Sequence, residues 1–154
     1  MELPRGITGF WHFKDAPPPT CDVAAFRKNC YAVARAHNGR VVAVEAPGHR
    51  VETNFARADL ELPAGRIVVL LNAHFPVIAF AEPPAEGEAS IRFIDSLGLD
   101  EAFRDFGEYE VVRVSELAAP LTPELCHRLA PAEREQIEYW QPQHVGDVVF
   151  NFWD

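Results

Sequence analysis

The chain has 154 residues and a net charge of −9, a size that suits one globular domain spanning residues 1–154. Apolar residues make up 48% of the sequence, so a hydrophobic core can form without disulfides or metals. The apolar runs Ile67–Leu71 and Val77–Ala81 are far shorter than the roughly 20 residues that cross a membrane. The first residues lack the pattern of a secretory signal, so we expect a cytoplasmic protein that is not bound to a membrane.

The acidic residues are concentrated in the second half of the chain. Residues 1–80 hold nine Lys and Arg against seven Asp and Glu, a net charge of +2, whereas residues 81–154 hold five Arg against sixteen Asp and Glu, a net charge of −11. Phosphate contacts need Lys and Arg, so this distribution argues against nucleic acid as a partner. It is compatible with a basic protein partner, because complementary charges steer association. Ordinary solubility is the simpler alternative.

The three cysteines, Cys21, Cys30 and Cys126, are odd in number and widely spaced. They form no CxxC motif, and no pair of histidines stands near them at the spacing of a zinc site. We therefore expect free thiols, no metal and no cofactor.

The N-terminal third predicts a strand followed by one long helix. Residues 6–13 are β-branched and aromatic, which favours a short strand, and the Pro-rich segment 15–19 ends it. Thr20 or Asp22 can cap a helix over Val23–His37, and Asn38-Gly39 can end it. Apolar residues recur along this helix at steps of three and four: Val23, Phe26, Cys30, Val33 and Ala34.

The middle of the chain predicts strands joined by tight turns. The expected strands cover residues 40–46, 51–62, 66–71 and 75–81. The last two are continuous apolar runs, typical of a buried hairpin. Pro76 cannot donate a hydrogen bond inside a central strand, so we expect it to mark the beginning of its strand.

The C-terminal half predicts short elements of both kinds. We expect strands over residues 90–94 and 109–114, helices over residues 97–106, from Thr122-Pro123 and over residues 131–140, and a final strand over residues 145–153. Strands that follow one another through tight turns favour an antiparallel sheet. The expected fold class is therefore α+β, a mainly antiparallel sheet with one long N-terminal helix and several short C-terminal helices.

The two ends of the chain share an aromatic character. Gly-Phe-Trp-His-Phe near the start and Phe-Asn-Phe-Trp at the finish have the same kind of composition. Termini usually fray unless they are tied down, so we expect these two ends to pair in the sheet or pack in one cluster.

Two histidines and one asparagine, His74, His12 and Asn72, are the candidates for catalysis. His74 follows Asn72 at the tip of the most apolar hairpin, where a loop on a rigid sheet can present an acid–base pair. His12, between Trp11 and Phe13, is a weaker candidate. Asn and His also tolerate turn backbones, so a purely structural role at the hairpin tip stays open. The motifs GxSxG and GxGxxG and the Walker loop are missing from the sequence.

Acidic and tryptophan residues provide candidates for binding. One predicted acidic patch comprises Asp100, Glu101, Asp105, Glu108 and Glu110, although such a run of charges is usually a solvated face. Trp140 and Trp153 belong either to the core or to an interface.

Three functions fit these features. The first is a small acidic binding or inhibitory protein, since small acidic bacterial proteins that neutralise toxins have a broadly similar composition. The second is an enzyme with a dispersed site around Asn72, His74 and His12. The third is a structural module that forms homo-oligomers through its aromatic ends.

Overall fold

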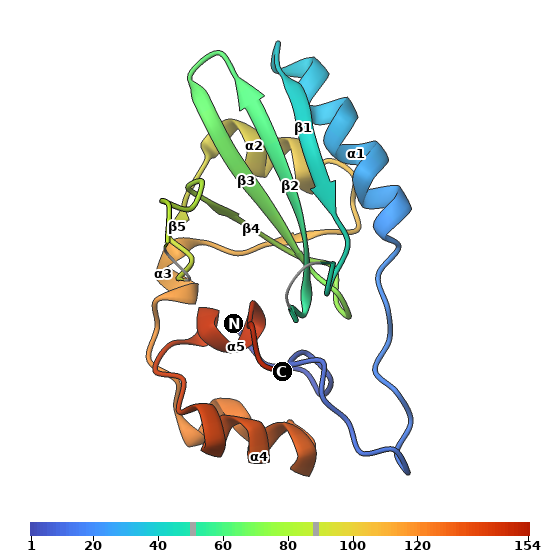
Figure 1. The fold of residues 1–154 in the computed structure, drawn as a ribbon, viewed down its shortest axis with the longest axis vertical. Coiled ribbons are helices and arrows are strands. Elements are labelled where there is room, and N and C mark those ends of the chain that lie inside the picture. The colour runs from blue at the N-terminus through green and yellow to red at the C-terminus, as the bar shows by residue number, and fades with distance from the viewer. Residues whose placement is uncertain (50–51, 88–89) are drawn as a thin grey trace.

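The computed structural model describes residues 1–49, 52–87 and 90–154, which form a mainly antiparallel sheet with helices around it (Figure 1). The elements in chain order are α1 (Val23–Ala36), β1 (Arg40–Glu45), β2 (Phe55–Leu62), β3 (Gly65–Asn72), β4 (Val77–Ala81), β5 (Phe93–Ile94), α2 (Leu97–Arg104), β6 (Glu110–Val111), α3 (Val114–Leu117), the 3₁₀ helix η1 (Pro123–Cys126), α4 (Pro131–Trp140) and α5 (Val145–Val149). The predicted α+β class is confirmed.

The sheet follows the order β1-β2-β3-β4-β5, with every neighbouring pair antiparallel, and β6 pairs parallel with β4. β2 and β3 form its longest ladder, from Phe55 opposite Asn72 to Leu62 opposite Gly65. The predicted hairpin of two apolar strands is β3 and β4, and Pro76 lies just before β4, as expected.

One face of the sheet is covered by α1 and α2, and we call it the closed face (Figure 1). Side chains alternate between the two faces of a strand, so every second residue of β2 and β3 points to this side. The buried residues that meet there come from both helices and four strands: Phe26, Cys30, Val33, Ala34, Ala56, Ala58, Leu60, Ile67, Val69, Leu71, Ile78, Phe80, Leu99, Phe103 and Val111.

We call the opposite face the open face. Part of its area is covered by the first residues of the chain, by α3, and by α5 with the residues that follow it. Its buried cluster joins Val68 and Leu70 of β3 to Leu3 and Ile7 from the start of the chain and to the segment 145–150. Figure 1 shows both chain ends and α5 beyond one end of the strands, with α4 farther out.

Helix α1 forms as its sequence predicts. The Asp22 carboxylate accepts a hydrogen bond from the Ala25 N–H at 3.0 Å and so caps the helix. Asn38, two residues after the helix, has φ 60°, the left-handed conformation that commonly ends helices. Phe26, Cys30 and Val33 are buried against the closed face.

The predicted terminal strands are wrong. Residues 6–13 form turns and irregular backbone, and Gly6 (φ 100°) and Gly9 (φ 86°) adopt positive φ values outside the range of a regular strand. Residues 145–153 form helix α5 and an irregular tail. The predicted proximity of the two ends is confirmed, because the Phe10 and Trp153 rings lie 6.3 Å apart.

Several other predicted boundaries differ from the structure. The strand expected over residues 109–114 is shortened to β6, since α3 already begins at Val114. The strand expected over residues 90–94 is shortened to β5, and the helix expected from Thr122 is a single 3₁₀ turn. The strand expected from Val51 begins at Phe55, and Val51 itself lies outside the described residues.

Candidate functional site

The side chain of Asn72 holds the two ends of the chain in place and does not line a candidate site. Its side-chain amide donates to the carbonyl oxygens of Ile7 (3.0 Å) and Val149 (2.8 Å). Its side-chain oxygen accepts from the N–H groups of His74 (2.9 Å) and Phe75 (3.0 Å). Both halves of the amide are therefore used by backbone, which leaves Asn72 no free group for acid–base chemistry.

Asn54 and Asn151 form a second closure beside it. The Asn151 N–H donates to the Asn54 side-chain oxygen at 2.7 Å, and the Asn54 N–H donates to the Asn151 carbonyl at 3.3 Å. The Asn54 side chain also donates to Ile7 and Val149, and the Asn151 side chain donates to Thr8 and Val148. These bonds fix the start and the end of the chain against Asn54, the residue just before β2.

Glu133 anchors the N-terminal turn to α4. It is fully buried, and its carboxylate accepts from the Gly6 N–H, the Ala130 N–H, and both the N–H and the hydroxyl of Thr8, at 2.7–3.2 Å. Backbone donors compensate the buried charge, since charged groups survive inside proteins only when fully hydrogen-bonded. The contact with Ala130 also caps the first turn of α4.

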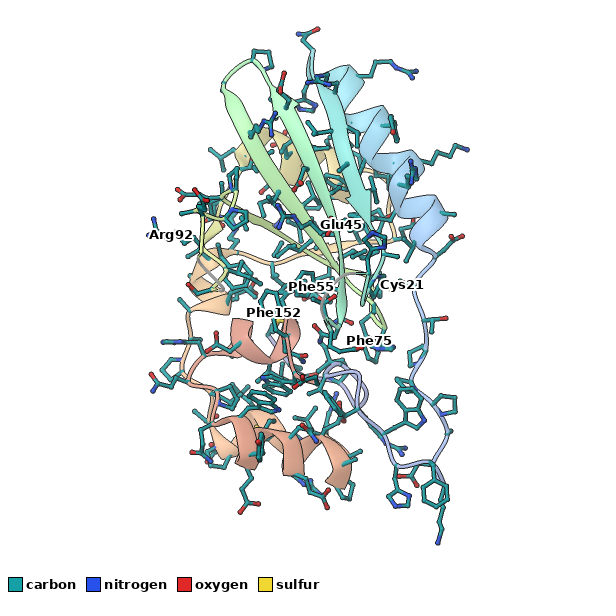
Figure 2. All side chains as sticks on the ribbon, viewed as in Figure 1. Cys21, Glu45, Phe55, Phe75, Arg92 and Phe152 are labelled. Atoms are coloured by element: carbon teal, nitrogen blue, oxygen red, sulfur yellow. The ribbon has the colours of Figure 1, made fainter. Side chains whose placement is uncertain are left out.

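A cavity of about 630 Å³, which we call the sheet cleft, lies on the uncovered part of the open face. Four of its lining residues form an apolar floor: Phe55, Val68, Leu70 and Ala81. Phe152 packs edge-on against Phe55 at 5.4 Å, and the two lie together in Figure 2. The remaining lining residues are Glu45, Ala46, His49, Glu52, Thr53, Arg57, Glu82, Pro84, Ser90, Ile91, Phe152 and Asp154.

Charged groups surround this floor. Arg57 follows Phe55 by two residues in β2, so both side chains point to the open face. Its Nε lies 2.8 Å from the Asp59 carboxylate, so its charge is already matched. Four carboxylates also line the cleft, those of Glu45, Glu52, Glu82 and Asp154, and that of Glu82 lies 4.0 Å from Arg92.

A second cavity, of about 390 Å³, adjoins the sheet cleft, and we call it the His74 pocket. The two cavities share Glu52, Thr53 and Asp154. Its remaining lining residues are Thr8, Gly9, Phe10, Asn54, His74, Asn151 and Trp153. Together the cavities form one hollow that runs from the sheet to the joined chain ends.

His74 has a defined orientation in this pocket. Its Nδ1 lies 2.8 Å from the Pro19 carbonyl oxygen, which can only accept, so Nδ1 carries a proton. In the neutral ring, Nε2 is then a hydrogen-bond acceptor.

The structure does not bring the three candidate catalytic residues together. His12 is exposed, stacks on Phe13 with ring centroids 4.7 Å apart, and accepts from the Lys14 N–H at 3.3 Å. It lines neither the sheet cleft nor the His74 pocket. Of the predicted set, His74 alone faces a cavity described here.

The predicted acidic patch is partly used internally. Asp100 is buried and lies 3.3 Å from Arg104, one turn later in α2. The other four members, Glu101, Asp105, Glu108 and Glu110, are exposed, and Glu108 accepts from the Asn29 side chain at 3.4 Å.

The candidate tryptophans lie beside each other. The Trp140 and Trp153 rings are parallel within 3°, with centroids 6.5 Å apart. Trp140 is 38% exposed and Trp153 is half-buried, so part of this pair faces solvent.

All three cysteines are free, as predicted, and burial suppresses their reactivity. Burial raises the pKa of Cys21 to about 11 and that of Cys30 to about 12, and it also raises the pKa of Cys126. A thiolate is the nucleophilic form, so none of these thiols is activated.

Within the described residues, no cluster of His, Cys, Asp and Glu has the arrangement of a metal site. The helices described here are also too short or too polar to cross a membrane.

The sequence reasoning missed the cleft residues Glu52, Arg57, Glu82 and Asp154. One signal was available, because Ala56, Ala58 and Leu60 alternate with Phe55, Arg57 and Asp59 and so assign Arg57 to the opposite face. The loop and tail residues Glu52, Glu82 and Asp154 carry no such periodic signal.

No protein-family model matches the sequence, and no curated protein or solved structure is detectably similar to the chain. The function is therefore argued from geometry.

Proposed function

We propose that this is a small acidic binding protein whose sheet cleft receives a basic, partly apolar segment of a protein partner. The observation that carries the proposal is the cleft itself: an apolar floor of four side chains bordered by four carboxylates, with Arg57 of the described lining paired to Asp59. Binding there would inhibit the partner, in the manner of small proteins that neutralise toxins. A cytoplasmic location fits the three free thiols.

The two parts of the cleft have different roles in this proposal. The apolar floor supplies affinity, since burying an apolar side chain contributes about 1.5–3 kcal/mol. The carboxylates Glu52, Glu82 and Asp154 speed the encounter with a basic partner and reject acidic ones. The exposed acidic residues of α2 extend the same field toward the other side of the molecule.

A peptide-display selection tests the proposal. The immobilised full-length protein selects from a random peptide library, and the variant Ala46→Trp, which adds a large ring at the exposed wall of the cleft, is used for counter-selection. We expect enriched peptides to combine Arg or Lys with large apolar residues and to bind A46W weakly.

A matched control separates the cleft from the acidic patch. The pair Glu101→Gln and Asp105→Asn removes two exposed charges from α2 and leaves the cleft intact. Peptides that bind A46W and the wild type equally well, but lose affinity for this control, would move the docking site to α2 and contradict the proposal.

One observation favours a catalytic alternative. His74 faces a cavity through a fixed ring, as a general base would. Its neighbours oppose this use, since the hydroxyls of Thr8 and Thr53 are both already donating, to Glu133 and to the Phe55 carbonyl. A binding role therefore accounts for the geometry better than a hydrolytic one.

A further inference from the structure

We propose that the His74 pocket binds the guanidinium group of an arginine side chain. This inference rests on the proposed function, because the arginine belongs to the partner segment that occupies the sheet cleft. It assigns one residue type of that segment to one place in the hollow.

The polar side chains on the floor of the pocket already form hydrogen bonds within the protein. The side chains of Asn54 and Asn151 both donate and accept within the protein. The hydroxyls of Thr8 and Thr53 likewise donate and accept, Thr8 with Glu133 and the Phe10 N–H, and Thr53 with backbone. These bonds make the floor rigid and chemically closed.

Apart from the indole N–H of Trp153, the polar side-chain groups that remain among the lining residues of the pocket are acceptors. The carboxylates of Glu52 and Asp154 make no hydrogen bond or ion pair with the described residues. The ring of His74, held by the Pro19 carbonyl, presents Nε2 as an acceptor. A ligand that fits these acceptors presents several donors and carries positive charge, as guanidinium and ammonium groups do.

The aromatic wall favours guanidinium over ammonium. Phe10 and Trp153 line the pocket with their rings 6.3 Å apart and tilted by 43°. A flat guanidinium can stack on such a ring while its fork of five N–H donors reaches several acceptors at once. An ammonium group is a compact, strongly hydrated charge that makes less use of this wall.

Gly9 keeps the imidazole accessible. A Cβ atom at this position would lie 3.2 Å from Nε2 of His74, and the φ of +86° already favours glycine. The absence of a side chain here leaves the acceptor open to the pocket.

The position of the pocket fits an extended segment. Because Glu52, Thr53 and Asp154 border both cavities, a chain that lays an apolar side chain on the floor of the sheet cleft can direct a nearby arginine past these residues. The two carboxylates would then flank the guanidinium.

A titration monitored by NMR tests the assignment on the full-length protein. The probes are N-acetylarginine methylamide, its lysine counterpart, and its citrulline counterpart, which has nearly the same shape without the charge. We expect the arginine probe to shift the imidazole signals of His74 and the indole signal of Trp153, with an affinity about tenfold above that of citrulline.

Substitutions of exposed residues keep the test independent of folding. Glu52→Gln and Asp154→Asn should each weaken the arginine probe about two- to fivefold, since both carboxylates are solvent-exposed. The control Glu101→Gln, on α2, should leave its affinity unchanged.

The outcomes separate this inference from the proposed function. If arginine and citrulline bind equally, or lysine binds as tightly as arginine, the guanidinium assignment is overturned. If a selected basic, apolar peptide still shifts the methyl signals of Val68 and Leu70 in that case, the sheet cleft keeps its proposed function. If neither the arginine probe nor the peptide shifts any signal, both proposals fail.

Discussion

The two faces of the sheet are built by different means. On the closed face, α1 and α2 cover the strands with apolar side chains at regular helical spacing, and Phe26, Cys30 and Phe103 are fully buried. On the open face, the covering comes from the two ends of the chain, and buried polar groups hold them in place through bonds that span up to 143 residues. One face is thus closed by periodic packing and the other by individual long-range hydrogen bonds.

This difference explains where the hollow lies. The regular helices α1 and α2 bury the strand residues beneath them, whereas the terminal segments leave the region beside Phe55, Val68 and Leu70 uncovered. The irregular covering therefore creates the cavities, and its loops and tail supply the charged walls. Binding residues are commonly found on loops held by a rigid scaffold.

The largest loss of stability on the open face is expected from removal of residues 150–154. It deletes Phe150, which packs against Phe55 and Phe93 at 5.9 and 5.8 Å, together with the bonds of Asn151. Each large buried side chain contributes about 1.5–3 kcal/mol, so the loss approaches the whole stability of a domain. Thermal unfolding of the truncated protein, followed by circular dichroism, should therefore show no cooperative transition.

The control for this truncation is Phe152→Ala, since Phe152 is 43% exposed and should contribute little. A truncated protein that melts within a few degrees of the full chain would show that the tail is not part of the core.

Glu133→Ala should be the next largest effect. It leaves the N–H groups of Gly6, Thr8 and Ala130 buried without their acceptor, and we expect a loss of about 3–5 kcal/mol in the free energy of unfolding. Urea unfolding measures it.

Glu135→Ala is the matched control on the same helix, because Glu135 is exposed and its loss should stay within about 0.5 kcal/mol. Equal effects of the two substitutions would contradict the anchoring role of Glu133.

Alkaline pH should lower the free energy of unfolding through Cys30, which is buried on the closed face. Burial raises the pKa of Cys30 from 9.0 to about 12, so above pH 9 the unfolded chain loses the thiol proton while the folded protein keeps it. The free energy of unfolding should therefore be unaffected by this group below about pH 9 and fall as the pH rises toward 12.

Urea unfolding at several pH values measures this slope, and Cys30→Ala provides the comparison. Tyr109, whose pKa burial raises to about 12, contributes in both proteins, so the difference isolates the thiol. Identical slopes for the two proteins would show that Cys30 ionises freely in the folded state.

The smallest change in stability is expected for Glu82→Gln at the wall of the sheet cleft. This residue is exposed and lies 4.0 Å from Arg92, so its loss should alter the free energy of unfolding by less than about 0.5 kcal/mol. The association rate of a selected basic peptide should nevertheless fall, most clearly at low salt. An unchanged rate, measured by stopped-flow fluorescence, would remove Glu82 from the binding surface.

The difference between the two faces also explains which parts of the fold could be predicted from the sequence. The stripe on α1, its Asp22 cap and the apolar runs of β3 and β4 are local patterns, and each predicts its element correctly. The segments 6–13 and 145–153 are also rich in β-branched and aromatic residues, but there this composition reflects burial between the chain ends. Only the glycines Gly6 and Gly9, with positive φ, hint that the first segment is not a strand.

The candidate site was less predictable than the fold. Asn72 and His74 stand two residues apart, and the structure gives one a purely structural role and directs the other into a cavity. Their different surroundings come from Ile7, Val149 and Pro19, which are far away in sequence. The donors to the Glu133 carboxylate and the walls of both cavities likewise depend on contacts between distant segments, which no single-sequence pattern encodes.

The bond between the side chain of Asn151 and the carbonyl of Thr8 also sets an order of events during synthesis. A ribosome delivers the closed face first, since all of its elements precede residue 112. The N–H groups of Gly6 and Thr8, although made early, have no acceptor until Glu133 has been translated, and the Thr8 carbonyl waits for the side chain of Asn151. The sheet cleft, which has Phe152 and Asp154 in its wall, is therefore completed well after the strands that form its floor.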